Sequence, residues 1–246
     1  MASEPVSSSV IWDNLWNLGD RHIHWDDGSR LIFNILRCQQ VRQPKRTLEV
    51  GCGTGKISAR LHKEGFDISL MDFSAQALRL SKQVWLASDY EDEPLRIMAS
   101  MFGIPIKDNT YDLVWSAGVL EHWPRASQKL AVSEMVRVCR PGGKIVQIVP
   151  YSKSIPYRLA KWYKETRGTW PFGPEKPLSS MLPLLDLNQV ESVSQRSVGF
   201  LDQFRWLATF PGGKLSAALV RALQKRFWGL NLMLPGWLLI LTATKQ

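Results

Sequence analysis

Apolar and polar positions alternate with two different periods along residues 45–150. Short runs of strand type occur at Thr47–Val50, Ile68–Met71, Leu95–Met98, Leu113–Ser116 and Lys144–Val149. Between them, helical spacing of apolar residues predicts helices at Lys56–Glu64, Ala75–Ala87 and Ser127–Cys139. Strands that alternate with helices predict an α/β fold whose parallel sheet is wound by right-handed crossovers.

The alternation changes on both sides of this region. After Pro150, a proline-rich and aromatic stretch predicts an irregular insertion over residues 151–190. The remaining predicted elements are helices at Ile11–Leu18 and Ser29–Arg42, strands near Val193–Phe200 and Trp237–Thr244, and an amphipathic helix around Lys214–Phe227. The chain is therefore expected to form an α/β domain with additional cap segments.

Charge is distributed unevenly along the 246 residues. Residues 1–150 carry 18 Lys and Arg against 17 Asp and Glu, whereas residues 151–246 carry 13 against 5. This basic excess predicts contact with something anionic in the last third, or else a solvated basic face. Three scattered cysteines, and an N-terminal MASEPVSSSV without the pattern of a secretory signal, favour a reducing, cytoplasmic location.

The stretch TLEVGCGTGKISARL contains three glycines at alternate positions between a predicted strand and a predicted helix. A loop that binds nucleoside triphosphates needs four residues between its glycines and a hydroxyl after its lysine, but Ile57 follows Lys56. The dinucleotide fingerprint needs a glycine where Lys56 stands. The spacing therefore excludes the first ligand class and disfavours the second.

Two carboxylates flank this loop at the ends of neighbouring strands. Glu49 precedes the first glycine by two residues, where a negative charge repels a pyrophosphate and suits a ligand with an ammonium group. Asp72 ends the next strand in ISLMDFS, where a carboxylate can hold both hydroxyls of a ribose. Glycines let the backbone approach such a ligand closely.

With YDLVWSAGVLEHW and RVCRPGGKIVQIVP, these motifs resemble those of the class I S-adenosylmethionine-dependent methyltransferases, in particular their small-molecule, type 11 branch. The resemblance covers residues 45–150 and implies a doubly wound, mostly parallel, seven-stranded Rossmann-like sheet with an antiparallel last strand. It divides the expected domain into four parts: an N-terminal helical cap (1–44), the cofactor-binding core (45–150), a substrate cap (151–192) and the segment that completes the sheet (193–246).

The resemblance also implies a role for each matching position. The residues implied to bind S-adenosylmethionine, and its product S-adenosylhomocysteine, are Glu49, Gly51, Cys52, Gly53, Gly55, Asp72, Phe73, Ser100, Met101, Ser116 and Ala117. Glu49 and the glycine loop would take the methionyl part, Asp72 the ribose and Phe73 the adenine, with Ser116 and Ala117 at the methionine end. Ser100 stands where the family usually has an aspartate, so the adenine contact falls to its hydroxyl or to the Met101 amide.

Methyl transfer from a sulfonium is an in-line displacement, in which alignment of the reactants contributes most of the acceleration. His122 follows the fourth strand, and its ordinary pKa suits a general base for an acceptor that keeps its proton; local packing in a turn is the alternative. Apart from Glu121, the acidic residues of the magnesium-dependent catechol-type enzymes are missing, so the sequence predicts no metal.

Aromatic segments before and after the core predict the walls of an acceptor pocket. The candidate residues are Trp12, Trp16, Tyr151, Tyr157, Arg158 and Lys161. If this stretch is helical, Arg158 and Lys161, three residues apart, could share a face and meet an anionic group. The expected acceptor is a small, largely apolar molecule, such as a natural-product, isoprenoid or aromatic intermediate, with an acidic or phosphorylated end and an O, N or C atom to methylate.

Two other functions remain open from the sequence alone. The basic last third favours an RNA base methyltransferase, but the N-P-P-Y type loop that grips a flipped base is missing after the fourth strand, so nucleic acid is not the expected partner. The second is a non-catalytic protein that binds the cofactor to sense it or to support a partner. The helix at 214–227 could also rest on an anionic membrane, although docking on its own sheet is favoured. The oligomeric state is left open.

Overall fold

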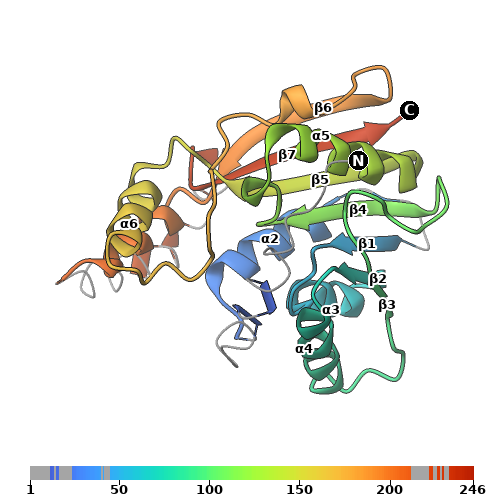
Figure 1. The fold of residues 1–246 in the computed structure, drawn as a ribbon, viewed down its shortest axis with the longest axis horizontal. Helices are drawn as coiled ribbons and strands as arrows, with labels where there is room; N and C mark the ends of the chain where they lie inside the picture. The colour runs from blue at the N-terminus through green and yellow to red at the C-terminus, as the bar shows by residue number, and fades with distance from the viewer. Residues whose placement is uncertain are drawn as a thin grey trace.

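One sheet of seven strands organises the computed structural model, which describes residues 12, 13, 15, 16, 24–39, 41, 45–211, 222, 223, 226, 227, 229 and 233–246. The strands are β1 (Arg46–Val50), β2 (Asp67–Asp72), β3 (Leu95–Met98), β4 (Tyr111–Ala117), β5 (Cys139–Pro150), β6 (Val190–Val198) and β7 (Leu238–Lys245). Their order is β3-β2-β1-β4-β5-β7-β6, and β7 runs antiparallel to both of its neighbours (Figure 1). The predicted Rossmann-like topology is confirmed.

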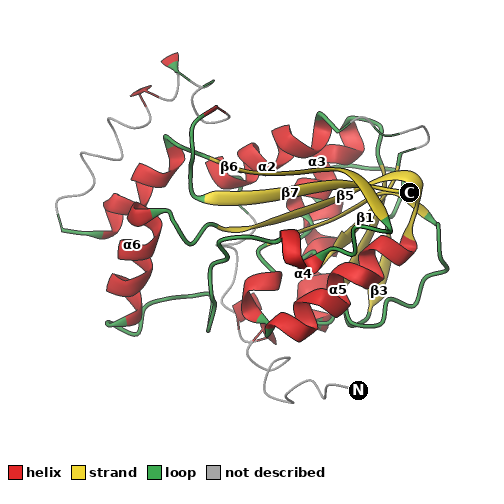
Figure 2. Cartoon of the chain, turned by 90° about the horizontal axis from the view of Figure 1, so that it is seen from above, coloured by secondary structure: helices red, strands yellow, loops and turns green. Residues whose placement is uncertain are grey.

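Helices cover both faces of this sheet. The α-helices are α2 (Asp27–Arg37), α3 (Lys56–Lys63), α4 (Ala75–Leu86), α5 (Arg125–Val138) and α6 (Ile155–Glu165). α2 and α3 pack on one face and α5 on the other, as Figure 2 shows. Because successive side chains of a strand point to opposite faces, Leu113 and Trp115 of β4 join the α2–α3 layer and Val114 joins the α5 layer.

Side-chain caps fix where two of these helices begin. Asp26 Oδ1 accepts a hydrogen bond from Ser29 N at 2.8 Å, and Ser74 Oγ accepts one from Ala77 N at 3.1 Å. Asp26 is therefore the cap of α2, which begins two residues before the predicted Ser29. Both caps lie at the same edge of the sheet as the glycine loop, because α2 packs on α3 and Ser74 follows β2 directly.

The prediction that residues 151–190 form an irregular insertion is wrong for one part of it, because α6 occupies Ile155–Glu165. Pro156 lies in the first turn of α6. Backbone N–H groups in the first turn have no partner within the helix, so a proline there costs no hydrogen bond. α6 packs against a 3-10 helix, η4 (Asp202–Thr209), and the two lie beyond the end of the sheet (Figure 1). They form a cap beside the carboxyl end of β5.

Two predicted helices extend outside the described residues: Ile11–Leu18 is described only in part, and so is Lys214–Phe227. The membrane-resting role suggested for the second falls on this segment. Across the described ranges, no helix combines the length and the apolar character that crossing a membrane requires.

Candidate active site

The glycine loop after β1 leads into α3 at the carboxyl edge of the sheet. Gly51 and Gly53 have φ values of 71° and 51°, and the N–H groups of Gly51 and Cys52 donate hydrogen bonds of 2.8 and 3.0 Å to a carbonyl near the end of β2. A Cβ on Gly53 would lie 2.6 Å from the ring of Trp16, and a Cβ on Gly51 would lie 2.6 Å from Val119. Glycine is required here for the left-handed backbone and for the space that a side chain would fill.

Asp72, at the end of β2, faces this loop. Its Oδ2 accepts a hydrogen bond from Gly53 N at 2.8 Å, and its Oδ1 accepts one from Ser74 N at 2.9 Å. Burial raises the pKa of Asp72 to about 6, against the lowering effect of these two hydrogen bonds. Each carboxylate oxygen has a second acceptor position, so Asp72 can accept hydrogen bonds from two hydroxyls while it holds the loop.

Glu49, near the end of β1, offers a buried acceptor to a ligand. The residue is 6% exposed, and its Oε2 has no hydrogen-bond partner among the described residues. Burial, with a contribution from the charge of Asp72, raises the pKa of Glu49 to about 8. A buried polar atom without a partner is destabilising, so a ligand ammonium that supplied the partner would fit this position.

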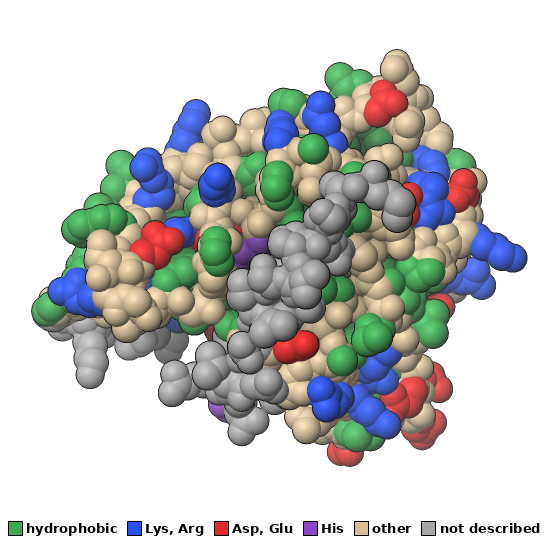
Figure 3. Space-filling model, viewed as in Figure 1, with side chains coloured by type: hydrophobic (Ala, Val, Ile, Leu, Met, Phe, Trp, Pro, Cys, Tyr) green, Lys and Arg blue, Asp and Glu red, His purple; other side chains and the backbone are tan. Residues whose placement is uncertain are grey.

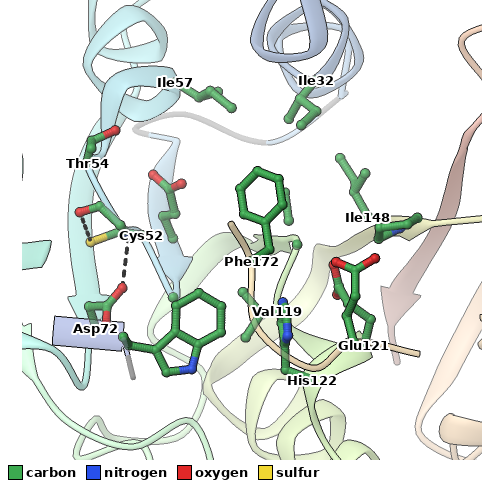
Figure 4. A pocket seen from close by; sticks show the side chains of 18 of the residues that line it. Ile32, Cys52, Thr54, Ile57, Asp72, Val119, Glu121, His122, Ile148 and Phe172 are labelled. Atoms are coloured by element: carbon green, nitrogen blue, oxygen red, sulfur yellow. Dashed lines mark hydrogen bonds between the residues drawn. The ribbon is translucent and has the colours of Figure 1, made fainter. Parts of the chain in front are cut away.

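A cavity of about 340 Å³ extends from the glycine loop to the cap. Its lining includes, from the sequence predictions, Trp12, Trp16, Glu49, Gly51, Cys52, Gly53, Asp72, Phe73, Ser100, Met101, Ala117, His122 and Tyr157. Cys52 and Asp72 lie on one side of the cavity in Figure 4, and Glu121 and His122 lie on the other. We call the part around Glu49 and Asp72 the loop end, and the part around Glu121 and His122 the cap end.

Three polar side chains meet at the cap end. A carboxylate oxygen of Glu121, one of Glu175 and a ring nitrogen of His122 lie within 4.8 Å of one another. Glu121 is 3% exposed, and its Oε2 has no partner among the described residues. Burial raises the pKa of Glu121 well above its usual range, and the Tyr157 hydroxyl donates a hydrogen bond to Glu175 Oε1. These atoms have the chemistry of metal ligands, a grouping that the sequence prediction of no metal did not anticipate.

His122 is held in one orientation by the residue before Glu175. Its Nδ1 lies 2.9 Å from Pro174 O, and because a carbonyl oxygen only accepts, Nδ1 donates its proton there. The lone pair of the neutral ring is therefore on Nε2. Burial lowers the pKa of His122, which favours this neutral form, and the ring of Trp12 meets the imidazole edge-on with centroids 4.7 Å apart.

Aromatic rings form the apolar wall of the cap end. Tyr157 of α6, Trp206 of η4 and Trp237 before β7 all line the cavity. The ring centroid of Tyr157 lies 4.9 Å from that of Trp206 and 5.8 Å from that of Trp237, and the two tryptophans are 5.4 Å apart. Only Tyr157 was among the predicted acceptor residues. The others come from two later segments, which only the fold brings together.

Five predicted site residues lie outside the cavity lining: Gly55, Ser116, Tyr151, Arg158 and Lys161. Gly55 precedes α3, and a Cβ there would meet Leu70 at 3.0 Å rather than the cavity. Ser116 Oγ donates to Gln147 Oε1 at 2.6 Å, so it joins β4 to β5 inside the sheet.

The cationic anchor predicted for the acceptor is not assembled at the cavity. Arg158 is exposed on α6, and buried Lys161 forms an ion pair with Glu165 on the same helix. Tyr151 donates its backbone N–H to Trp237 O at 2.7 Å and packs with the α5 layer. The cap end therefore presents carboxylates where the sequence predicted cations.

Residues 48–147 match the model of a family described as a methyltransferase domain. Over this stretch the chain is similar to that family. It is 32% identical over 136 residues to malonyl-(acyl-carrier protein) O-methyltransferase of Enterobacter lignolyticus, a match that covers 55% of this chain and 48% of that protein. It is 28% identical over 146 residues to 27-O-demethylrifamycin SV methyltransferase of Amycolatopsis mediterranei, covering 55% and 52%. The chain thus spans about half the length of these relatives.

Solved structures share the fold over most of this chain. Geranyl diphosphate C-methyltransferase of Streptomyces coelicolor, in complex with S-adenosylhomocysteine, aligns with a TM-score of 0.62 over 89% of this chain and 76% of that one. The two sequences are 14% identical. At this identity the likeness shows a common fold, and the acceptor has to be argued from this chain's own cavity.

Proposed function

We propose that the protein transfers the methyl group of S-adenosylmethionine to a small molecule bound at the cap end of the cavity. The observation that carries the proposal is the continuity of one cavity from Asp72 at the loop end to Tyr157 at the cap end. A donor at the first and an acceptor at the second would face each other, and alignment is what an in-line displacement needs.

The residues of the loop end would bind and orient the methyl donor, which supplies an electrophilic methyl group on a sulfonium. Glu49 would pair with its ammonium group through the unpartnered Oε2, and Asp72 would accept hydrogen bonds from its ribose hydroxyls. Phe73 would lie against the adenine, as the family resemblance implies. His122, neutral with its lone pair on Nε2, would accept a proton from an acceptor that has to lose one.

The cap end suits a small, largely apolar acceptor. Aromatic rings form its wall, and the relative named for demethylrifamycin supports an acceptor of this class. An RNA acceptor is less suitable, because carboxylates at the cap end would repel its phosphates. On the face shown in Figure 3, Lys and Arg side chains are spread out and mixed with Asp and Glu rather than gathered in one stripe.

Incubation with methyl-labelled S-adenosylmethionine and a fractionated extract of the source cells tests this function. Separate incubations would contain the small-molecule, RNA and protein pools. We expect label in a product of the small-molecule pool, identified by its mass, and much less label with the Asp72→Ala variant at a limiting concentration of S-adenosylmethionine. Label confined to the RNA pool or the protein pool would contradict the proposal.

A further inference from the structure

Carboxyl groups outnumber cations in the lining of the cavity, although the positive charge of Lys161, which lies outside the lining and pairs with Glu165, also acts on Glu175. Its lining contains Asp26, Glu49, Asp72, Glu121 and Glu175. Among the described lining residues Lys56 is the single Lys or Arg, and its Nζ pairs with Asp26 Oδ2 at 2.9 Å near the loop end. The chain as a whole has a formal net charge of +9, so the acidic cavity is opposite in character to the rest of the protein. A cationic ligand would favour the ionised form of these carboxyl groups and pair with them, so the lining suits positive charge better than negative charge.

The loop-end carboxylates have an assigned task if the proposed function holds. Glu49 and Asp72 meet the ammonium and the ribose of the methyl donor. Glu121 and Glu175 lie at the cap end with His122, where the acceptor has to bind. These two carboxylates are therefore available to the acceptor.

We propose that the acceptor is an amine, bound at the cap end as an ammonium between the Glu121 and Glu175 carboxylates and the rings of Tyr157, Trp206 and Trp237. This inference rests on the proposed function and narrows its acceptor class. It replaces the anionic acceptor that Arg158 and Lys161 predicted from the sequence, because neither of those residues lines the cavity.

The geometry of the acceptors fits an ammonium. Oxygen or nitrogen acceptors placed tetrahedrally about 2.8 Å from an ammonium nitrogen lie about 4.6 Å from one another. One carboxylate oxygen of Glu121, one of Glu175 and a ring nitrogen of His122 lie within 4.8 Å of one another, so the two carboxylates are close enough to share one ammonium beside the imidazole. Glu121 Oε2 is buried without a partner in the described structure, so an N–H donor would satisfy it.

The aromatic rings of the apolar wall provide the second set of contacts to the bound ammonium. Tyr157, Trp206 and Trp237 form a cluster in which every pair of ring centroids lies within 5.8 Å, and all three line the cavity. Ring faces attract a desolvated cation and hold apolar substituents at the same time. Tyr157 links the aromatic wall to the carboxylates, since its hydroxyl also donates a hydrogen bond to Glu175 Oε1.

The polar groups at the cap end can also accept the proton that the ammonium must lose before it is methylated. One proton of the bound ammonium passes to Nε2 of the neutral His122 beside this pair, which leaves a neutral amine with a free electron pair. The nitrogen then forms its bond to the methyl carbon while the carbon–sulfur bond breaks, and that bond's electron pair stays on sulfur. The products are a methylated ammonium and S-adenosylhomocysteine, with the transferred proton on the enzyme.

Calorimetry on the full chain, loaded with S-adenosylhomocysteine, tests the inference with three probes of one shape. The probes are tryptamine, tryptophol and indolepropionate, which end in an ammonium, a hydroxyl and a carboxylate. We expect tryptamine to bind roughly tenfold more tightly than tryptophol, since charged hydrogen bonds are about twice as strong as neutral ones, and indolepropionate to bind most weakly. Glu121→Gln and Glu175→Gln should each remove most of this preference, whereas Glu91→Gln, at an exposed site outside the cavity, should retain it.

Several results would overturn the inference. Equal binding of the three probes, or binding of none while S-adenosylhomocysteine binds, would do so. So would stoichiometric binding of Mg²⁺ or Mn²⁺ that Glu121→Gln abolishes, because the carboxylates would then form a metal site. A Glu121→Gln variant that weakens S-adenosylmethionine but not S-adenosylhomocysteine would assign this carboxylate to the sulfonium instead. Failure of S-adenosylhomocysteine to bind at all would contradict the proposed function itself.

Discussion

Asp72 Oδ2 accepts a hydrogen bond of 2.8 Å from the backbone N–H of Gly53, so the carboxylate at the end of β2 holds the loop at the end of β1. The bond links two positions 19 residues apart. It means that Asp72 has two tasks at the loop end, to shape the loop and to face the ligand.

Replacement of Asp72 by alanine removes both tasks. We expect Asp72→Ala to weaken S-adenosylhomocysteine binding roughly tenfold to a hundredfold, because hydrogen bonds to charged groups contribute about 1.5–3 kcal/mol each. Asp67→Ala, at the opposite end of the same strand, is the matched control and should bind normally. An analogue whose ribose lacks a hydroxyl should lose affinity for the wild type and not for Asp72→Ala. Equal losses in both proteins would show that Asp72 does not contact the ribose.

Cofactor binding should release a proton near pH 7. The pKa of Glu49 is about 8 in the free protein, so its carboxyl is mostly protonated at pH 7, and pairing with a ligand ammonium would ionise it. The enthalpy of S-adenosylhomocysteine binding should be measured by calorimetry in phosphate and in Tris at the same pH. Because the two buffers differ in their heat of ionisation, the difference gives the number of protons released on binding. We expect close to one proton released in the wild type and little release in Glu49→Gln. Enthalpies that do not depend on the buffer would contradict the role of Glu49.

The stability of the ligand-free protein should fall as the pH rises. The pKa values of Glu49 and Asp72 are raised in the folded state, to about 8 and about 6, from ordinary values of 4.5 and 3.8. The folded state then holds protons that the unfolded chain has lost, so the free energy of unfolding decreases from about pH 4 to about pH 8. Thermal unfolding across this range should show a smaller decrease of Tm in Glu49→Gln than in the wild type. Parallel profiles for the two proteins would contradict the raised pKa of Glu49.

His122 is expected to affect turnover more than binding. His122→Asn keeps a hydrogen-bond donor for Pro174 O but removes the lone pair on Nε2. The variant would therefore lose the general base and keep the hydrogen bond that orients the side chain. With the acceptor identified from the extract, kcat should fall roughly 10²–10⁴-fold, the usual contribution of such a base. The affinity for S-adenosylhomocysteine should not change. An unchanged kcat would mean that His122 has a packing role beside Trp12 and that the carboxylates handle the proton.

The loop end could be predicted from the sequence because it is built from local patterns. Glu49, the glycines and Asp72 each stand at a strand end, and neighbouring parallel strands bring their carboxyl ends to one edge of the sheet. The same regularity predicted a parallel sheet of strands that alternate with helices, and the family resemblance added the seven strands and the antiparallel last strand. Ser116 was misplaced because strand alternation was not applied to it: like Val114 it lies on the α5 face of the sheet, where its Oγ donates to Gln147 Oε1.

The cap end could not be predicted, because its residues come from segments that have no periodic pattern in common. Glu175 lies in a proline-rich loop, Trp206 in a 3-10 helix and Trp237 before β7, and their proximity depends on tertiary packing alone. Arg158 and Lys161 were chosen for their charge and helical spacing. The exposure of Arg158 was not visible in that spacing, whereas the pairing of Lys161 with Glu165, four residues later on the same helix, could have been predicted and was overlooked.

Titration of the full chain with S-adenosylmethionine, in the wild type and in Gly53→Val, tests the central claim that the loop end binds the methyl donor. Gly53 has a φ of 51°, and a side chain there would collide with Trp16 at 2.6 Å and strain the loop. Gly65→Val is the matched control, since Gly65 also has positive φ but nothing within 4 Å of its Cβ position. The wild type and Gly65→Val should bind one equivalent in the micromolar range, about −8 kcal/mol, and Gly53→Val should bind none. Absence of both binding heat and a thermal shift in the wild type, or equal affinity in Gly53→Val, would contradict the account.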